Sequence, residues 1–288
     1  MKIVFFGAGY CCRYIIPNLE DKSEIICTHN LKTKPEKYDE VFQIKRLSFR
    51  DFLNNKENLL KDVTHILNSI PPVENGDVVY EMFNSLDDKI LSKLVWFGYF
   101  SSTSVYGDHD GKWVDEETKT SPTNIRGEMR LKVENLYMEL FKKKKLPIHV
   151  FRLPGIYGPG RSALDRILNG NNSVIRLKNH FFSRVHVEDI ASAINKSMTI
   201  RTPGQIYNLT DNFPCSAHEV HEYASKLLKT QLPRYLDISS SNLNERVKDF
   251  YKDNKRVSNQ KIKKILDWTP KFENYKLGLN NIFESLNG

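Results

Sequence analysis

The 288-residue sequence is poor in cysteine and contains no long apolar run. Its four cysteines show neither a CxxC spacing nor a partnered histidine pattern, so neither a zinc site nor a disulfide framework is supported. No apolar stretch approaches the ~20 residues that a membrane-spanning helix needs. We therefore expect a cytoplasmic protein with reduced thiols, no metal site and no membrane association.

Charge of one sign is in moderate excess. Lys and Arg number 43 against 35 Asp and Glu, a formal net charge of +8, which favours anionic ligands or simply solubility. The lysine run 142–145 ends a helical pattern, where cations suit the helix dipole and face water. We expect a small-molecule substrate and no nucleic-acid partner, and the composition is compatible with a homodimer.

Short apolar runs alternate with helical patterns along most of the chain, as in an α/β fold. Such alternation predicts a Rossmann-type doubly wound parallel sheet in residues 1–155, completed by about 183–210. Residues 156–182 and 211–288 would form a small, mostly helical substrate lobe, because strand alternation is lacking after 210. The Gly- and Pro-rich loop 154–161 is expected to be irregular. The predicted strands cover 2–6, 24–28, 41–44, 65–70, 94–100, 148–153, 183–187 and 205–209.

The first predicted strand runs directly into Gly7-Ala8-Gly9, ahead of a helical stretch. Glycines at such a turn let the backbone approach a pyrophosphate, whose charge the N-terminus of the following helix favours. The third small position of the pattern holds Cys12 instead of glycine. The place of the motif, after a strand and before a helix, predicts dinucleotide binding more strongly than a mere tight turn.

The second predicted strand lacks the carboxylate that usually holds the ribose 2′-hydroxyl of NAD. It ends in Thr28-His29-Asn30, and Lys32 and Lys34 follow. The missing acid and the nearby cations favour the 2′-phosphate of NADP, with NAD as the alternative cofactor. The other interpretation is a polar surface loop whose lysines contact nothing.

Four predicted strands end in glycine, proline or small hydroxylated residues, so their carboxyl edges can line one crevice. The central one is an apolar run followed by Ser101-Ser102-Thr103-Ser104-Val105-Tyr106-Gly107. The residues expected to bind the cofactor are Gly7, Gly9, Tyr10, Cys11, Cys12, Thr28, His29, Asn30, Lys32, Ile70, Pro71, Pro72, Ser101, Pro154, Gly155 and Ile156.

Taken together, the blocks 7–10, 101–107, 152–160, 184–191 and 206–209 resemble the extended short-chain dehydrogenase/reductase superfamily, of the nucleotide-sugar epimerase and dehydratase type. The resemblance covers essentially the whole chain. It implies that Ser102 matches the serine that polarises the substrate carbonyl. At the family's YxxxK motif, Arg126 and Arg130 stand where the proton-transferring Tyr and the Lys belong. In this the chain is similar to atypical members that keep the nucleotide site without the usual acid.

An arginine cannot donate a proton near neutral pH, because its pKa exceeds ~12. Arg126 and Arg130 can only stabilise negative charge, so the proton must come from water, from substrate or from another residue such as Tyr157. The alternative is that Arg126, Arg130 and Glu134, spaced i, i+4, i+8, form a surface charge ladder. The residues expected at the catalytic centre are Ser102, Arg126 and Arg130, and those expected to contact substrate are Thr103, Tyr157, Arg161, Arg184 and His186.

Two functions remain open at this level. One is an NADP-linked oxidoreductase or epimerase that acts on a small anionic or sugar-like substrate. The other is a redox sensor or scaffold that binds NADP(H) without turnover, which the absent tyrosine favours.

Overall fold

The computed structural model describes residues 1–19, 23–29, 37–74, 76–239, 243 and 245–287. The chain divides into two compact units. The first comprises residues 1–102, 129–152 and 190–207, and the second comprises 103–128, 153–189 and 208–288.

A seven-stranded sheet forms the centre of the first unit within the described residues, in the order β11-β7-β5-β4-β1-β2-β3. β1 pairs in parallel with β2 and with β4, so the chain reverses its direction across the sheet at β1. That switch point is where open α/β sheets bind ligands. The strands are β1 Lys2–Phe6, β2 Glu24–His29, β3 Lys45–Ser48, β4 His65–Asn68, β5 Trp96–Ser102, β7 Ile148–Leu153 and β11 Gln205–Asn208.

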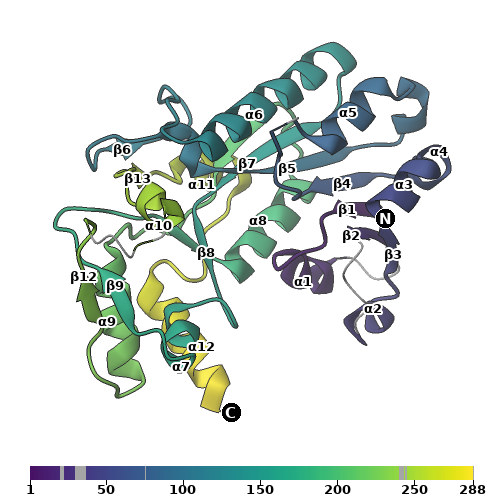
Figure 1. Cartoon of the computed structure of the whole chain (residues 1–288). Coiled ribbons are helices and arrows are strands. Elements are labelled where there is room, and N and C mark those ends of the chain that lie inside the picture. Colours follow the sequence, from purple (N-terminus) through teal and green to yellow (C-terminus); the bar gives the residue numbers. More distant parts are fainter. Residues whose placement is uncertain (20–22, 30–36, 75, 240–242, 244, 288) are drawn as a thin grey trace. The chain divides into compact units, whose positions relative to one another are not determined.

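Helices cover both faces of this sheet, as the doubly wound prediction requires. Figure 1 shows α5 and α6 on one side and α1 and α8 on the other. Aromatic side chains fill the α5–α6 side: Phe83 meets Phe97 edge-on at 5.3 Å, and Tyr137 lies 4.8 Å from Tyr99. The helices are α1 Cys12–Ile15, α2 Lys37–Val41, α3 Phe49–Asn54, α4 Lys56–Leu60, α5 Val78–Ser85, α6 Ile125–Lys144 and α8 Val187–Thr199, with 3-10 turns at Ile16–Asn18 and Asp88–Leu91.

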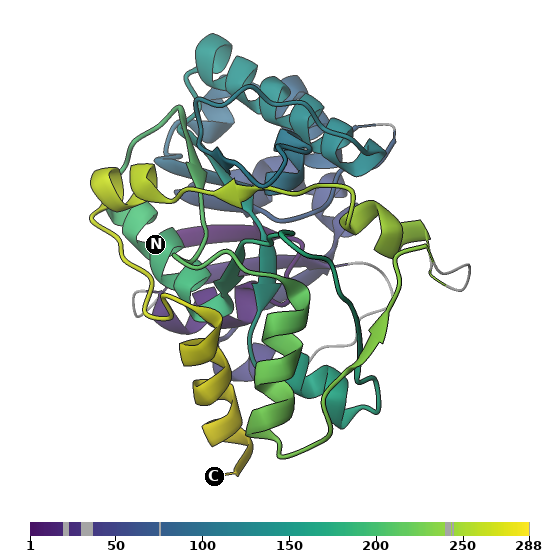
Figure 2. The same ribbon diagram turned by 90° about the vertical axis from the view of Figure 1, so that its left-hand side faces the viewer.

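The second unit is built from short strand pairs and helices. Figure 2 shows α9 and α12 side by side, where Tyr223 meets Tyr275 edge-on at 5.7 Å. The parallel pairs are β8 Gly155–Tyr157 with β10 Arg184–His186, β9 Ser173–Ile175 with β12 Arg234–Leu236, and β6 Trp113–Val114 with β13 Arg256–Val257. The helices are α7 Ala163–Leu168, α9 Ala217–Leu227, α10 Glu245–Phe250, α11 Gln260–Leu266 and α12 Tyr275–Asn287, with a 3-10 turn at Thr103–Tyr106.

Three local predictions are wrong. The strand expected at 41–44 is instead β3 at 45–48. Gln43 has a φ of 50°, so an extended strand cannot run through it. β3 lies at the edge of the sheet, where charged residues such as Lys45 and Arg46 are common. Loop 154–161 contains β8. Pro154 has no N–H to donate to a strand ladder, and pairing with β10 begins at the next residue, Gly155. β12 and β13 interrupt the region expected to be helical, and they are too short to show alternation.

Candidate functional site

The loop after β1 turns on two glycines that serve different purposes. Gly7 has a φ of +82°, and a Cβ on it would lie 3.0 Å from Cγ1 of Ile70, so both the conformation and the close approach require glycine. Gly9 is exposed, and a Cβ on it would meet nothing nearer than the Gly7 carbonyl oxygen at 3.9 Å. The loop is therefore closed against the sheet at Gly7 and open at Gly9.

The strands on both sides of β1 fix this loop. The N–H of Gly7 donates to Oγ1 of Thr28 over 3.2 Å, and the N–H of Ala8 donates to the Thr28 carbonyl over 3.1 Å. After β4, the Ser69 hydroxyl donates to the Gly7 carbonyl over 2.5 Å. The switch point thus brings together the loops after β1, β2 and β4. Of the other residues expected to bind cofactor, Tyr10, Cys11 and Cys12 continue the first loop, His29 ends β2, Pro71 and Pro72 follow Ile70, and Asn30 and Lys32 lie outside the described residues.

The thiols of this region are buried and uncharged. Burial raises the pKa of Cys12 well above its usual value, and it raises the pKa of Cys27 to about 12. Neither thiol is a nucleophile near neutral pH, since that role needs the thiolate. The loop interior therefore adds no negative charge that would repel a pyrophosphate.

A buried polar network supports the β4 side of the loop, and the sequence reasoning missed it. Nδ2 of Asn68 donates to the Tyr137 hydroxyl over 2.8 Å and to Oδ2 of Asp77 over 3.1 Å. Oδ1 of Asp77 accepts from the N–H groups of Val79 and Tyr80, which caps α5. An Asp directly before a helical pattern is a cap signal that was available in the sequence. The contact with Tyr137 is not, because 60 residues separate it from Asp77.

Small hydroxylated side chains mark the end of β5. Ser101 is 4% exposed, and its Oγ has no hydrogen-bond partner among the described residues. Ser102 is half-buried, and Arg130 on α6 reaches the same strand by donating from Nη1 to the Phe100 carbonyl. Arg130 thereby places a guanidinium at the carboxyl edge of β5.

The three charged residues of α6 do not form one exposed ladder. Arg126 is exposed and Arg130 is half-buried against β5. Glu134 is 1% exposed and accepts from Nη2 of Arg152 on β7 over 2.7 Å and from Nε over 3.1 Å. The ladder interpretation is therefore wrong for Glu134, because its partner comes from a neighbouring strand, which helical spacing alone cannot show.

The beginning of α6 packs closely on the turn that carries Thr103, within the second unit. A Cβ on Gly127 would lie 2.7 Å from the carbonyl oxygen of Ser104, so only glycine fits there. Oδ1 of Asn124 caps the helix by accepting from the N–H of Gly127 over 3.0 Å. These contacts fix the backbone next to Arg126 against the turn that begins at Thr103.

A cavity of about 1040 Å³ lies within the second unit, between α7, α9, α10, α12 and the strand pairs β8–β10 and β9–β12. Its wall combines apolar and aromatic side chains, which suits an organic ligand with an extended body. Tyr157, Arg161 and Arg184, three of the residues expected to contact substrate, line it, as do Gly155 and Ile156. His186 does not line it but packs against the Tyr157 ring at 5.1 Å.

Arg184 holds one wall of the cavity together. Its Nη1 donates to the carbonyls of Phe182 and Cys215 over 2.8 and 3.1 Å, and Nη2 donates to the Ser216 carbonyl over 3.3 Å. Ser216 and Glu219 form a capping box at the start of α9. Much of the hydrogen-bonding capacity of Arg184 is thus used within the wall.

Asp211 is a buried carboxyl near this wall, with one oxygen, Oδ2, that has no partner among the described residues. Burial is the main cause that raises its pKa from 3.8 to about 8. A carboxyl whose folded-state pKa is raised stabilises the fold fully below the unfolded pKa, and this stability is lost as pH rises through the folded value.

We expect the Asp211→Asn variant to lose less stability than the parent protein as pH rises from 3.8 to about 8. Each tenfold change in proton affinity corresponds to about 1.4 kcal/mol, so the gap should grow by about 6 kcal/mol over this range. Denaturant unfolding of both proteins at several pH values measures it. Parallel pH profiles would contradict a buried, ionising Asp211.

Among the described residues, no group of three or more His, Cys, Asp or Glu side chains is placed to hold a metal ion. In the same part of the chain, no helix has the length and hydropathy to cross a membrane.

The sheet order and the glycine loop at its switch point define a dinucleotide-binding α/β protein of the extended short-chain dehydrogenase/reductase type. The model of the NAD dependent epimerase/dehydratase family matches residues 74–210. A functionally unknown conserved protein from Silicibacter pomeroyi DSS is 35% identical, with a TM-score of 0.87 over 99% of this chain and 98% of that chain. The chain belongs to the NAD dependent epimerase/dehydratase family.

More distant relatives share the fold. A dTDP-glucose 4,6-dehydratase from Bacillus anthracis in complex with NAD has a TM-score of 0.74 at 20% identity, over 100% of this chain and 96% of that chain. Protein YeeZ of Escherichia coli K12 is 27% identical over 150 residues. That match spans about half of each protein, 52% of this chain and 52% of YeeZ.

The residues present fit a dinucleotide at the switch point. The surface at Gly9 is open to the close approach of a phosphate, and the Ser101 hydroxyl at the sheet edge has no partner among the described residues. No carboxylate ends β2.

Proposed function

We propose that the protein is an NADP(H)-dependent oxidoreductase or epimerase that acts on a small sugar-like or anionic substrate. The open surface at Gly9, at the switch point of a sheet of this family, carries the proposal. The cofactor would supply the hydride chemistry. The protein would bind the cofactor, orient the substrate and polarise its reacting group. We assign cofactor binding to the loop after β1 and to Ser101. We assign the same role to Pro154, Gly155 and Ile156.

Preference for NADP(H) follows from the end of β2. Thr28 is buried, and its hydroxyl accepts from the N–H of Gly7. β2 does not end in an acidic residue that could bind a ribose 2′-hydroxyl. A 2′-phosphate bound at the end of β2 would not be repelled by a carboxylate of that strand end.

We expect NADPH to bind at least about tenfold more tightly than NADH, because one charged hydrogen bond contributes about 1.5–3 kcal/mol. Titration of both reduced cofactors, followed by nicotinamide fluorescence or calorimetry, measures the ratio. Equal or tighter binding of NADH would refute the preference and would leave the dinucleotide site itself standing.

We propose that Ser102 orients a carbonyl or hydroxyl group of the substrate. Thr103 is the next residue in the chain. Arg130 would supply positive charge at the edge of β5, in place of the family's lysine. Arg126 would bind an anionic group or a developing oxyanion. Neither arginine transfers a proton, so the proton would come from substrate or water, or from Tyr157, whose hydroxyl is buried and has no partner among the described residues.

The cavity of the second unit supports a substrate with an extended body. Solved relatives include a UDP-glucose 4-epimerase from Thermotoga maritima with UDP-glucose, which makes sugar nucleotides the first class to test. Arg161 at the cavity and the net positive charge would favour a phosphate group. Tyr157, Arg184 and His186 would shape the wall.

The proposed activity is tested by incubating the protein with NADP(H) and a panel of UDP-, dTDP- and ADP-sugars. Epimerised or dehydrated sugars would be detected by mass spectrometry and NMR. Conversion that Ser102→Ala abolishes would support the proposal. No conversion of any sugar, together with tight NADPH binding, would favour the second candidate.

That second candidate is a non-catalytic NADP(H)-binding sensor or scaffold. The two arginines at 126 and 130 favour it, because they remove the usual proton donor while leaving the cofactor loop intact. A sensor would change its partner binding or its dimerisation with cofactor occupancy. An enzyme would instead turn over substrate.

A further inference from the structure

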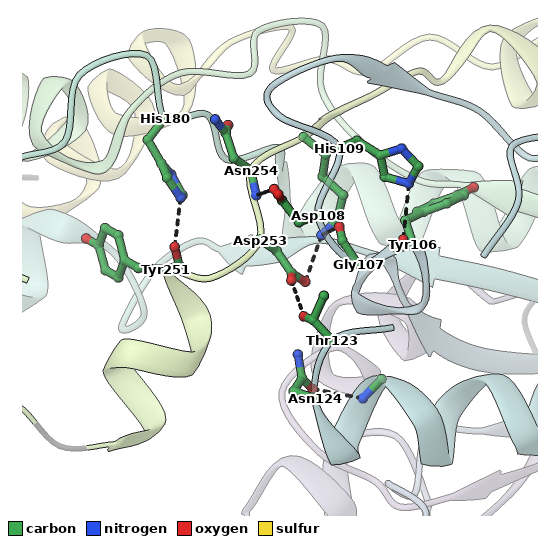
Figure 3. A network of polar contacts seen from close by, with 12 residues as sticks. Tyr106, Gly107, Asp108, His109, Thr123, Asn124, His180, Tyr251, Asp253 and Asn254 are labelled. Carbon is green, nitrogen blue, oxygen red and sulfur yellow. Dashed lines mark hydrogen bonds and ion pairs between the residues drawn. The ribbon is translucent and has the colours of Figure 1, made fainter. Parts of the chain in front are cut away.

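Three consecutive residues near the C-terminus hold the turn that follows β5. Lys255 is 8% exposed, and its Nζ donates to the Gly107 carbonyl over 2.8 Å and to Oδ2 of Asp253 over 3.0 Å. The other carboxylate oxygen of Asp253 accepts from the hydroxyl of Thr123. Figure 3 shows Asp253 close to Thr123 and to Gly107. A buried ion pair therefore joins the turn after β5 to the residues that precede α6.

Asn254, between them, binds two further segments. Its carbonyl accepts from the N–H groups of His109 and Gly111 over 3.0 and 2.9 Å. Its side-chain Oδ1 accepts from the N–H of Phe181 over 2.9 Å, and its Nδ2 donates to the Asn179 carbonyl over 2.9 Å. These bonds fix segment 107–111 and segment 179–181 to the same three residues.

A close glycine contact also joins the turn after β5 to the residues that precede α6. A Cβ on Gly107 would lie 1.8 Å from the Ser121 carbonyl oxygen, so this turn rests directly on the chain that enters α6. Thr103 begins the turn, and Arg126 stands on the first turn of α6. Both are residues to which the proposed function assigns substrate or charge contacts.

The residues just before Asp253 face the cavity. Phe250 and Tyr251 line it, and Phe250 is 56% exposed. Phe250 stacks on Phe182 with ring centroids 4.7 Å apart and an interplanar angle of 5°, and Tyr251 meets the same ring edge-on at 5.1 Å. The Tyr251 carbonyl also lies 3.0 Å from Nε2 of His180, as Figure 3 shows.

We propose that segment 250–255 links the cavity to the turn after β5. A ligand that packs on Phe250 and Tyr251 fixes Asp253 and Lys255, which position the body that carries Thr103 and Arg126. Asp253 and Lys255 are then positioning residues. The roles of Thr103 and Arg126 in this link rest on the proposed function, but the mechanical link does not.

Hydrogen exchange of the free protein tests the link without any ligand. We expect Lys255→Ala to speed amide exchange in 107–111 by about tenfold, because the local opening there loses its buried partner. Lys252→Ala is the matched control, since Lys252 lies in the same segment but is exposed and pairs with the exposed Asp249. Added n-propylammonium should restore part of the protection in Lys255→Ala, and tetramethylammonium should not.

The cavity end of the link is tested by Phe250→Ala, which removes an exposed ring and keeps the fold. We expect it to speed exchange in 107–111 by about threefold or more, and to add nothing in the Lys255→Ala background. Phe213→Ala, at an aromatic side chain that is 47% exposed and does not line the cavity, is the control.

Each outcome decides the proposal. Faster exchange from Phe250→Ala that depends on Lys255 supports the link. Exchange in 107–111 that stays at the parent rate, or that Phe213→Ala changes equally, overturns it, even if Lys255→Ala fails to fold. Because neither cofactor nor substrate is present, an absent enzymatic activity leaves this result unchanged and refutes only the proposed function.

Discussion

The Gly9→Val variant is expected to fold normally and to lose NADP(H) binding. Gly9 is exposed, and a Cβ there would touch only the Gly7 carbonyl at 3.9 Å, so the fold has room for the side chain. A pyrophosphate drawn onto the loop would meet the new methyl groups. Loss of two charged hydrogen bonds at about 1.5 kcal/mol each weakens the affinity by about a hundredfold or more.

Calorimetric titration with NADPH measures this loss, and thermal unfolding verifies the fold. Gly7→Ala is the control at the neighbouring glycine. Its φ of +82° and the 3.0 Å approach to Ile70 predict a loss of stability of about 1 kcal/mol or more, irrespective of cofactor. Affinity near the parent value in a folded Gly9→Val protein would move the cofactor site away from this loop.

The sequence predicts the part of the site that depends on local chain geometry. Glycines between an apolar run and a helix need only their neighbours to be interpreted, and Gly7 does adopt the left-handed conformation. The cap of α3 is of the same kind: the Ser48 hydroxyl accepts from the N–H of Asp51, three residues further along the chain, over 3.0 Å. Such signals lie within a few residues of one another.

Contacts between distant residues escape this kind of prediction. Lys255 bonds to Gly107 across 148 positions of sequence, and no spacing rule relates the two. Asn68 and Tyr137 meet in the same way across 69 positions. The tertiary fold brings each pair together, and no local pattern in the sequence relates the two partners.

Glu134 is the case in which local spacing leads to the wrong environment. Residues 126, 130 and 134 share one ridge of α6, so the pattern indicates a solvated ladder. Along this ridge the exposed Arg126 is followed by the half-buried Arg130 and then by the buried Glu134, which pairs with Arg152 of β7. Helical periodicity gives the direction of a side chain but not what covers it.

We expect Glu134→Ala to lower the free energy of unfolding by about 3–5 kcal/mol, since it removes one member of a buried ion pair and the carboxylate that accepts from the Arg152 guanidinium. Arg152 is 4% exposed and cannot reach water without moving β7. Its guanidinium now forms three bonds to Glu134, at 3.1, 3.2 and 2.7 Å. Denaturant unfolding, followed by the near-ultraviolet circular dichroism of the aromatic core, measures the loss.

Glu139→Ala is the matched control, because Glu139 lies on the same helix but is exposed and pairs with the exposed Lys143 over 3.1 Å. Loss of an exposed i, i+4 pair should change stability by no more than about 0.5 kcal/mol. The double variant Glu134→Ala, Arg152→Met removes both buried charges, so it should recover part of the loss and show a coupling energy of about 1–3 kcal/mol. If Glu134→Ala instead behaved like Glu139→Ala, the buried pair of Glu134 and Arg152 would stabilise the fold no more than an exposed pair does, which would contradict this prediction.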